Sequence, residues 1–116
     1  MEMTTLNLPE DLRQALDQAV AAIVEIAHPE LVILFGSWAE GTARPDSDVD
    51  LLVVADYAER GATHAALHRV LRSILGTREF DLLLYKPQEW ARSRRLIGFV
   101  PHEADRYGVK LVERAA

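Results

Sequence analysis

Apolar residues follow two different spacings along this chain, and the two spacings predict different elements. In two long stretches they recur every three or four residues, which is the period of an amphipathic helix. The first helix is expected to open at Pro9, because proline suits a first helical turn, and to end before Pro29, because the residue before a proline is steered away from helical angles. Its apolar positions are Leu12, Leu16, Ala19, Val20, Ile23 and Ile26.

The second periodic stretch predicts another helix of similar length. Asp56 with Glu59 forms a capping-box-like pattern ahead of it, although Gly61 leaves a start nearer Thr63 as the alternative. Gly76 is a suitable residue to end it. One apolar face is expected to be buried, formed by Leu67, Val70, Leu71, Ile74 and Leu75.

Short, mainly apolar runs predict buried strands rather than helices. The run at 31–35 is continuously apolar, and two further strands are expected at 49–55 and 79–85. Pro87 is expected to open a short helix, and a further helix and a last strand are expected at 102–107 and 108–113. The chain is therefore expected to have an α/β (α+β) fold, in which a small mixed β-sheet is flanked by helices.

The loop between the first two predicted strands carries the most distinctive chemistry. Gly36 lets a backbone approach a ligand closely, and Ser37 offers a hydroxyl and an N–H to an anion, especially if a helical turn starts there. Ten residues later, Asp48 and Asp50 stand at the head of the second strand. Their side chains point the same way, with Cα atoms roughly 6–7 Å apart. Such a pair can converge on Mg²⁺, which prefers carboxylate oxygens and keeps substrate phosphates in its shell.

Asp81 is the natural third ligand of this site. It stands in the third predicted strand, which otherwise looks buried, and an isolated buried carboxylate is costly without a cation or hydrogen bonds. Glu79 is expected on the same face and is a weaker candidate. Two common motifs are excluded: an EF-hand requires glycine at Leu51 and glutamate at Tyr57, and a P-loop requires Lys-Ser/Thr at 42–43, which hold Thr and Ala.

The combination of Gly36-Ser37, ten residues, Asp48-x-Asp50 and the later Asp81 resembles the motif of minimal nucleotidyltransferases. These proteins are the small branch of the DNA polymerase β-like nucleotidyltransferase superfamily. The resemblance is strongest over 31–90, and it implies one nucleotidyltransferase domain over 1–116.

The resemblance also implies roles for individual residues. Asp48 and Asp50 would bind both of two Mg²⁺ ions, and Asp81 would complete one metal site and act as base or electrostatic orienter. The candidate nucleotide-binding residues are Gly36, Ser37, Arg44 and Ser47. Relatives often carry arginine where this chain has Glu40, a departure that weakens the expected triphosphate site unless Arg44 compensates.

The implied activity is transfer of AMP from ATP to a hydroxyl. Small proteins of this kind are commonly antitoxins that adenylylate a tyrosine of a HEPN-type toxin, so a hetero-oligomer with such a partner is expected. The shortness of the chain, 116 residues, favours a shallow acceptor site or one completed by a partner. Two alternatives remain open. One is a weak or inactive nucleotidyltransferase-fold module that neutralises a toxin by binding, and the other is nucleotidyl transfer to a small molecule or RNA.

Composition narrows the remaining classes. The formal charge is −5, which argues against direct nucleic-acid binding through bulk electrostatics. Without cysteine the chain has neither disulfides nor thiolate metal sites. Residues 1–5 lack the basic and apolar regions of a secretory leader, and no apolar run is long enough to span a membrane, so a cytoplasmic location is expected.

Several other residues allow two interpretations. Trp38 either stacks on a base or fills space under the loop, and His64 with His68 is either a zinc-binding pair or part of a solvated helix face. A basic cluster either contacts a ligand or is a charged helix face; it is Arg92, Arg94 and Arg95. A neighbouring apolar strip is a candidate partner surface if it is exposed; it is Leu96, Ile97, Phe99 and Val100.

Overall fold

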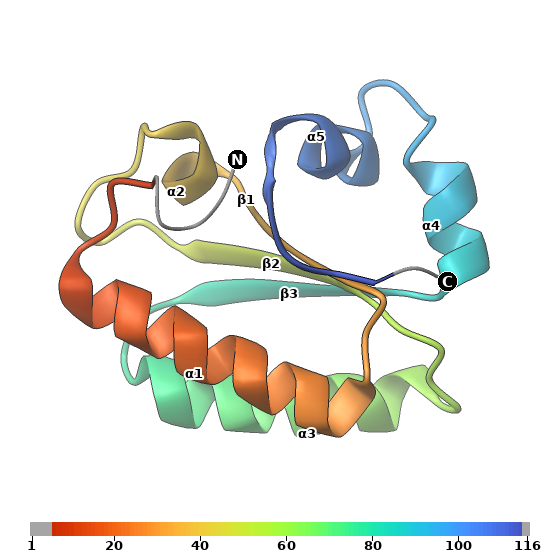
Figure 1. Cartoon of the computed structure of the whole chain (residues 1–116), viewed down its shortest axis with the longest axis horizontal. Coiled ribbons are helices and arrows are strands. Elements are labelled where there is room, and N and C mark those ends of the chain that lie inside the picture. The colour runs from red at the N-terminus through yellow and green to blue at the C-terminus, as the bar shows by residue number, and fades with distance from the viewer. Residues whose placement is uncertain (1–5, 115–116) are drawn as a thin grey trace.

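The computed structural model describes residues 6–114 and shows one four-stranded sheet with helices on both faces (Figure 1). In chain order the elements are α1 (Glu10–Ala27), β1 (Leu31–Phe35), α2 (Ser37–Glu40), β2 (Val49–Val54), α3 (Arg60–Leu75), β3 (Phe80–Tyr85), α4 (Pro87–Ser93), α5 (Val100–Tyr107) and β4 (Val109–Glu113). This confirms the expected fold class and the expected order of elements.

The sheet has the order β3-β2-β1-β4 and is mixed. β1 is antiparallel to both β2 and β4, whereas β2 and β3 run parallel. The parallel pair requires a crossover connection, which α3 supplies. As a result, the beginnings of β2 and β3 lie side by side at one end of the sheet.

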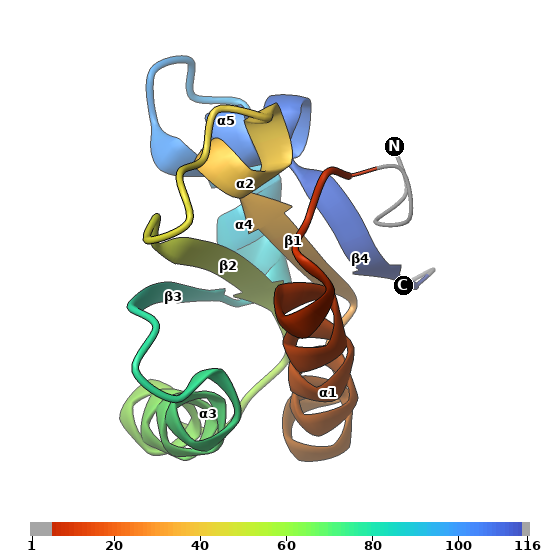
Figure 2. The same ribbon diagram turned by 90° about the vertical axis from the view of Figure 1, so that its left-hand side faces the viewer.

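The two helices α1 and α3 cover one face of the sheet and pack against each other (Figure 2). The α1 face expected from the sequence is buried through Leu12, Leu16 and Ile23, each at most 1% exposed. His28 ends α1 in a left-handed conformation, with its N–H donating to Val24 O. This face carries the larger of two apolar clusters, and burial on this scale is the main stabilising term of the fold.

The opposite face of the sheet is covered only in part, by α4 and α5. Trp90 of α4 and Ala104 of α5 pack there against Leu52, Val54 and Ile33. The cluster does not reach the first residue of β2 on this face. One end of the face, at the beginning of β2 and β3, is therefore left to polar side chains.

The capping-box pattern of Asp56 with Glu59 predicts a helix that starts directly after Asp56, but α3 begins at Arg60. Glu59, rather than Asp56, is the N-cap of α3, and its carboxylate accepts hydrogen bonds from the N–H groups of Gly61 and Ala62 at 3.0 and 2.6 Å. These bonds hold the pKa of Glu59 below its usual value. Thr63 lies inside the first turn, so the helix begins between the two positions expected from the sequence.

The outer edge of β3 has no neighbouring strand among the described residues. Two α3 side chains bond to it instead. Arg60 donates to Leu84 O at 2.7 Å, and the Nε2 of His64 lies 3.0 Å from Leu82 O, a bond in which the ring nitrogen donates. The ring of His68 stacks near that of His64 and packs against Phe80. The two histidines are thus engaged with β3, and they do not form a zinc-binding pair.

The residues on which the leader expectation rests, Met1–Thr5, lie outside the described residues. Within residues 6–114, no helix has the length and apolar character needed to cross a bilayer.

Candidate active site

Two carboxylates are placed opposite each other at the open end of the partly covered face. Asp50 and Asp81 are register partners in the parallel pairing of β2 with β3. Each follows a buried residue that points to the other face, Val49 on β2 and Phe80 on β3. Because side chains alternate along a strand, both aspartates point to the side of α4 and α5. Strand register alone therefore brings the two predicted acids together.

The environment of Asp50 favours its protonated form. Partial burial, a hydrogen bond with the Asp81 carboxyl and repulsion from Asp81 and Asp48 raise the pKa of Asp50 to about 6, in descending order of effect. Two carboxyls that share a hydrogen bond need a proton between them, and like charges at close range disfavour full ionisation. Asp50 thus lies close enough to Asp81 and Asp48 for the negative charge of each to act on it.

Gly36 lies directly against the Asp50 carboxylate. Phe35, the last residue of β1, pairs with Asp50, so the chain turns away next to that carboxylate. Gly36 has φ +76° and ψ −156°, a combination that is essentially restricted to glycine. A Cβ atom at this position would collide with Oδ2 of Asp50. Both the backbone angles and the close approach therefore require glycine, as the sequence motif implied.

Ser37 begins α2, a single helical turn, which confirms the turn expected at this point. The carbonyl of Gly36 accepts the N–H groups of Ala39 and Glu40, at 3.1 and 3.0 Å. Ser37 is partly exposed and directly follows Gly36.

Trp38 supports the loop from beneath. It is 6% exposed, and its indole N–H donates to Ser47 O at 3.0 Å. Ser47 and Arg44 close a turn in the same loop, because the Arg44 N–H donates to the Ser47 hydroxyl at 2.7 Å and the Ser47 N–H donates to Arg44 O at 3.0 Å. The buried interpretation of Trp38 is correct, since a buried indole has no free face for a base. Of the two predicted nucleotide-binding residues here, Ser47 has its hydroxyl engaged in the loop, whereas the Arg44 side chain is exposed.

Arg78 is a supporting residue that the sequence did not reveal. Its guanidinium donates to Pro45 O at 2.9 Å and lies 5.7 Å from the centre of the Trp38 ring. It thus ties the loop that precedes Asp48 to the segment that precedes β3. One arginine before a predicted strand carries no distinctive signal, so only the three-dimensional arrangement identifies it.

Asp81 differs from expectation in its exposure. The sequence argument treated it as a carboxylate in a buried strand, but its side chain is exposed, because α4 and α5 do not extend over the beginning of β3. Glu79, the weaker rival, is exposed as well and lies before the first residue of β3. Asp81 is therefore a candidate ligand on the ground of its register with Asp50, and burial no longer supports it.

Within residues 6–114 no three His, Asp or Glu side chains are already gathered in a way that could hold a metal ion. The donor chemistry nevertheless fits Mg²⁺. Asp50 and Asp81 offer hard oxygen ligands side by side, and a divalent cation would relieve the repulsion that helps to raise the pKa of Asp50. Asp48 is exposed just before β2, close enough for its charge to raise the pKa of Asp50. These three aspartates are the residues that would hold such an ion.

Glu40 is the last residue of α2, the helical turn that directly follows Gly36. It helps to line a small pocket of about 170 Å³ together with Phe35 and Gly36, and the far wall comes from α5 and the segment before it. The pocket adds a further carboxylate beside the glycine, where the resemblance led us to expect a cation.

Comparison with known proteins identifies a family for this chain. A family model described as polymerase beta, nucleotidyltransferase matches residues 18–97, which is more than half of the chain and includes all of the candidate site residues. One solved structure, described as that of a proposed minimal nucleotidyltransferase, is 26% identical with a TM-score of 0.62; the match covers 94% of this chain and 95% of that one. No curated protein matches significantly.

Proposed function

The chain belongs to the polymerase β-type nucleotidyltransferase family, and from this premise we propose that it is a Mg²⁺-dependent enzyme that transfers AMP from ATP to a protein hydroxyl. The observation that carries the proposal is the register pairing of Asp50 with Asp81 beside Gly36. The proposed acceptor is a tyrosine of a HEPN-type toxin, for which the chain would be the antitoxin. A cytoplasmic location accords with this role.

The proposed reaction needs a site that binds a triphosphate and increases the nucleophilicity of a hydroxyl. The acceptor oxygen bonds to the α-phosphorus, the bond from that phosphorus to the β-phosphate bridging oxygen breaks, and pyrophosphate leaves with the acceptor's proton passing to a base. Mg²⁺, when bound, would stabilise the attacking and leaving oxygens. Asp48, Asp50 and Asp81 would hold it, and Asp81, which is exposed, would accept the acceptor's proton.

The Gly36-Ser37 turn would position the phosphates. The absence of a side chain at Gly36 keeps the space beside Asp50 clear, and the Ser37 hydroxyl can donate to a phosphate oxygen. Positioning and electrostatics account for most of the catalysis of phosphoryl and nucleotidyl transfer, because the protein need not form a covalent bond itself.

The exposure of Asp81 and Asp48 supports a macromolecular acceptor. A site at the open end of a sheet face can be reached by a side chain of another protein, whereas a small acceptor would need walls that residues 6–114 do not supply around these carboxylates. This is the reason to prefer a protein hydroxyl over a small molecule.

The test is incubation of the protein with each α-³²P-labelled nucleoside triphosphate, Mg²⁺ and the product of the neighbouring gene. We expect label from ATP on a partner tyrosine, and loss of labelling in Asp48→Asn and in Asp50→Asn. Asp46→Asn is the matched control, since it removes a charge from the same exposed loop without touching the site. Near-normal labelling by either site variant would overturn the mechanism.

A second function is favoured by one observation, the Glu40 carboxylate in the pocket beside Gly36. A negative charge there opposes a bound triphosphate, as expected for a module that neutralises its partner by binding alone. Stable complex formation without label would support this alternative. Glu40→Arg would then be expected to strengthen binding of ATP with Mg²⁺, measured by calorimetry.

A further inference from the structure

The segment that joins α4 to α5 exposes an unusual concentration of large apolar side chains. Ile97 is 82% exposed and Phe99 60%, and Leu96 and Val100 beside them are also exposed. We call these four residues the apolar ridge. A soluble domain seldom leaves several neighbouring aliphatic and aromatic side chains in water unless another molecule covers them.

The ridge is built on an ordered backbone. The N–H of Leu96 donates to Ser93 O and that of Phe99 donates to Leu96 O, both at 3.1 Å, so consecutive turns shape the segment. Gly98, at φ +90°, reverses the chain between the two most exposed residues. A surface that is already shaped loses little conformational entropy on binding, which favours a docking role over a frayed connection.

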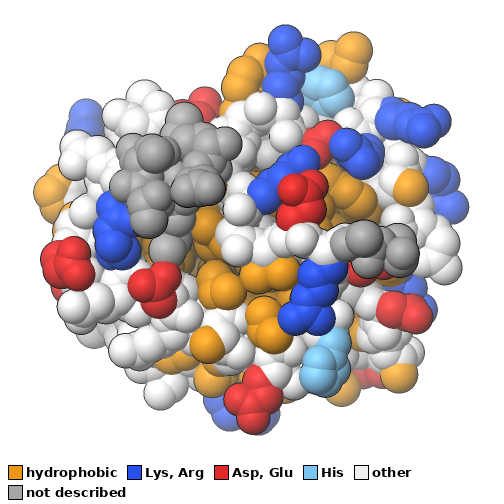
Figure 3. Space-filling model, in the orientation of Figure 1, with side chains coloured by type: hydrophobic (Ala, Val, Ile, Leu, Met, Phe, Trp, Pro, Cys, Tyr) orange, Lys and Arg blue, Asp and Glu red, His pale blue; other side chains and the backbone are white. Residues whose placement is uncertain are grey.

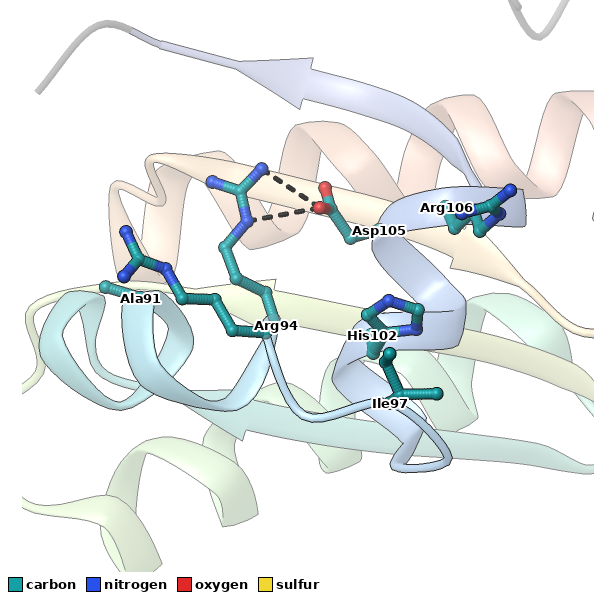
Figure 4. Close-up of a pocket in the computed structure, with 7 residues that line it drawn as sticks. Ala91, Arg94, Ile97, His102, Asp105 and Arg106 are labelled. Carbon is teal, nitrogen blue, oxygen red and sulfur yellow. Dashed lines mark hydrogen bonds and ion pairs between the residues drawn. The ribbon is translucent and has the colours of Figure 1, made fainter.

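Cationic side chains border the ridge. Arg94 is neutralised, since its guanidinium bonds to the Asp105 carboxylate at 2.9 and 3.1 Å (Figure 4). Arg95 and Arg106 line the same open hollow of about 700 Å³, and neither has an ion pair within the described residues. Ile97 and His102 also line the hollow, and the buried Nδ1 of His102 has no hydrogen-bond partner among the described residues.

The same combination is visible on the molecular surface. Hydrophobic and Lys or Arg side chains lie next to one another over α5 and along the side of α4 (Figure 3). The whole chain, in contrast, carries a charge of −5. The ridge is therefore an apolar and locally basic surface on an otherwise acidic protein.

The ridge also reaches the candidate active site. Val100, at one end of the ridge, and the exposed Tyr107 line the small pocket whose opposite wall is Phe35, Gly36 and Glu40. Gly36 in turn lies against Asp50. Only this pocket and Gly36 therefore separate a chain bound along the ridge from the Asp50 carboxylate.

We infer that the apolar ridge, together with Arg95 and Arg106, is the docking surface for the acceptor protein, and that it binds a segment in which apolar side chains alternate with acidic ones. The inference rests on the proposed transfer to a protein hydroxyl. The apolar side chains of the segment would cover Ile97 and Phe99, and its carboxylates would pair with Arg95 and Arg106. RNA is disfavoured, because three of the four ridge side chains are aliphatic and offer no stacking surface to bases, and the net charge repels a polyanion.

The test uses random 12-residue peptides displayed on phage and panned against the full chain. Recovered peptides are expected to be rich in acidic and apolar residues. Measured by fluorescence polarisation, their affinity is expected to fall at least tenfold for Ile97→Glu with Phe99→Glu and severalfold for Arg95→Glu. Ile26→Glu is the matched control, because Ile26 is an exposed apolar residue on α1, away from the ridge, and this variant should bind as the wild type does.

Several results would overturn the inference. They are failure to recover any peptide that depends on the ridge, peptides without acidic residues, and binding of a labelled single-stranded RNA that the double variant abolishes. A wild-type dimer in light scattering that Ile97→Glu converts to monomer would assign the ridge to a second copy instead. If a ridge-dependent peptide carrying a tyrosine extension binds but takes no label from ATP and Mg²⁺, the docking surface stands and the proposed transfer fails.

Discussion

Replacement of Asp50 by asparagine is expected to make the metal-free protein more stable while abolishing its activity. The pKa of Asp50 is raised from 3.8 to about 6. One pKa unit corresponds to about 1.4 kcal/mol, so keeping this carboxylate ionised at pH 7.5 costs at most about 3 kcal/mol. Solvent reaches the partly exposed side chain and reduces the cost to about 1–2 kcal/mol. Asparagine has nearly the same shape, carries no charge and can donate to Asp81.

The assay is urea unfolding at several pH values in the presence of EDTA. At pH 7.5 the midpoint for Asp50→Asn should exceed that of the wild type by about 0.5–1 M. Because the folded pKa is the higher one, the protonated carboxyl stabilises the fold fully below pH 3.8, and this contribution is lost as the pH rises through about 6. The advantage of the variant should therefore shrink between pH 7 and pH 4.5.

Each measurement is compared with Asp46→Asn, which is expected to stay within about 0.5 kcal/mol of the wild type at every pH. Adding 10 mM Mg²⁺ should stabilise the wild type and leave Asp50→Asn unchanged. The reasoning is refuted if Asp50→Asn has no advantage at pH 7.5, or if the same advantage persists at pH 4.5.

Three further substitutions test the parts around this pair. Gly36→Ala should lower the free energy of unfolding by about 1–3 kcal/mol, through unfavourable backbone angles and a collision with Asp50, and should abolish ATP labelling; wild-type stability in urea would contradict this. Trp38→Phe should cost about 1 kcal/mol, by losing the bond to Ser47 O, and should speed proteolysis within the loop; unchanged cleavage rates would argue against the support role. Gly108→Ala should cost about 1–3 kcal/mol in thermal unfolding without changing the labelling per folded molecule, because a Cβ there would press on the backbone of Leu34 and Ala104; an unchanged melting temperature would disprove the close packing.

The sequence predicts elements well where one physical signal dominates. The apolar runs place β1, β2 and β3 to within a residue at either end, because largely buried strands leave few other interpretations. Gly36 is likewise predictable, since the motif and the backbone angles require the same residue.

Exposure is the property that the sequence could not supply. The run around Asp81 reads as buried, but coverage of that face depends on how far α4 and α5 extend over the sheet, which no local pattern records. For the same reason, the sequence does not show whether Trp38 is buried. Its buried position depends on a hydrogen bond to Ser47 O, nine residues away, and on the guanidinium of Arg78 against its ring.

The side chains of Arg60 and His64 have a consequence for how the protein behaves at high concentration. An edge strand with free carbonyl groups can recruit a strand of another molecule, which is a common route to aggregation. On β3 the carbonyls of Leu84 and Leu82 already accept bonds from α3, so an incoming strand would have to displace both. The crossover helix that brings the two aspartates into register therefore also protects the β3 edge of the sheet against the addition of a strand from another molecule.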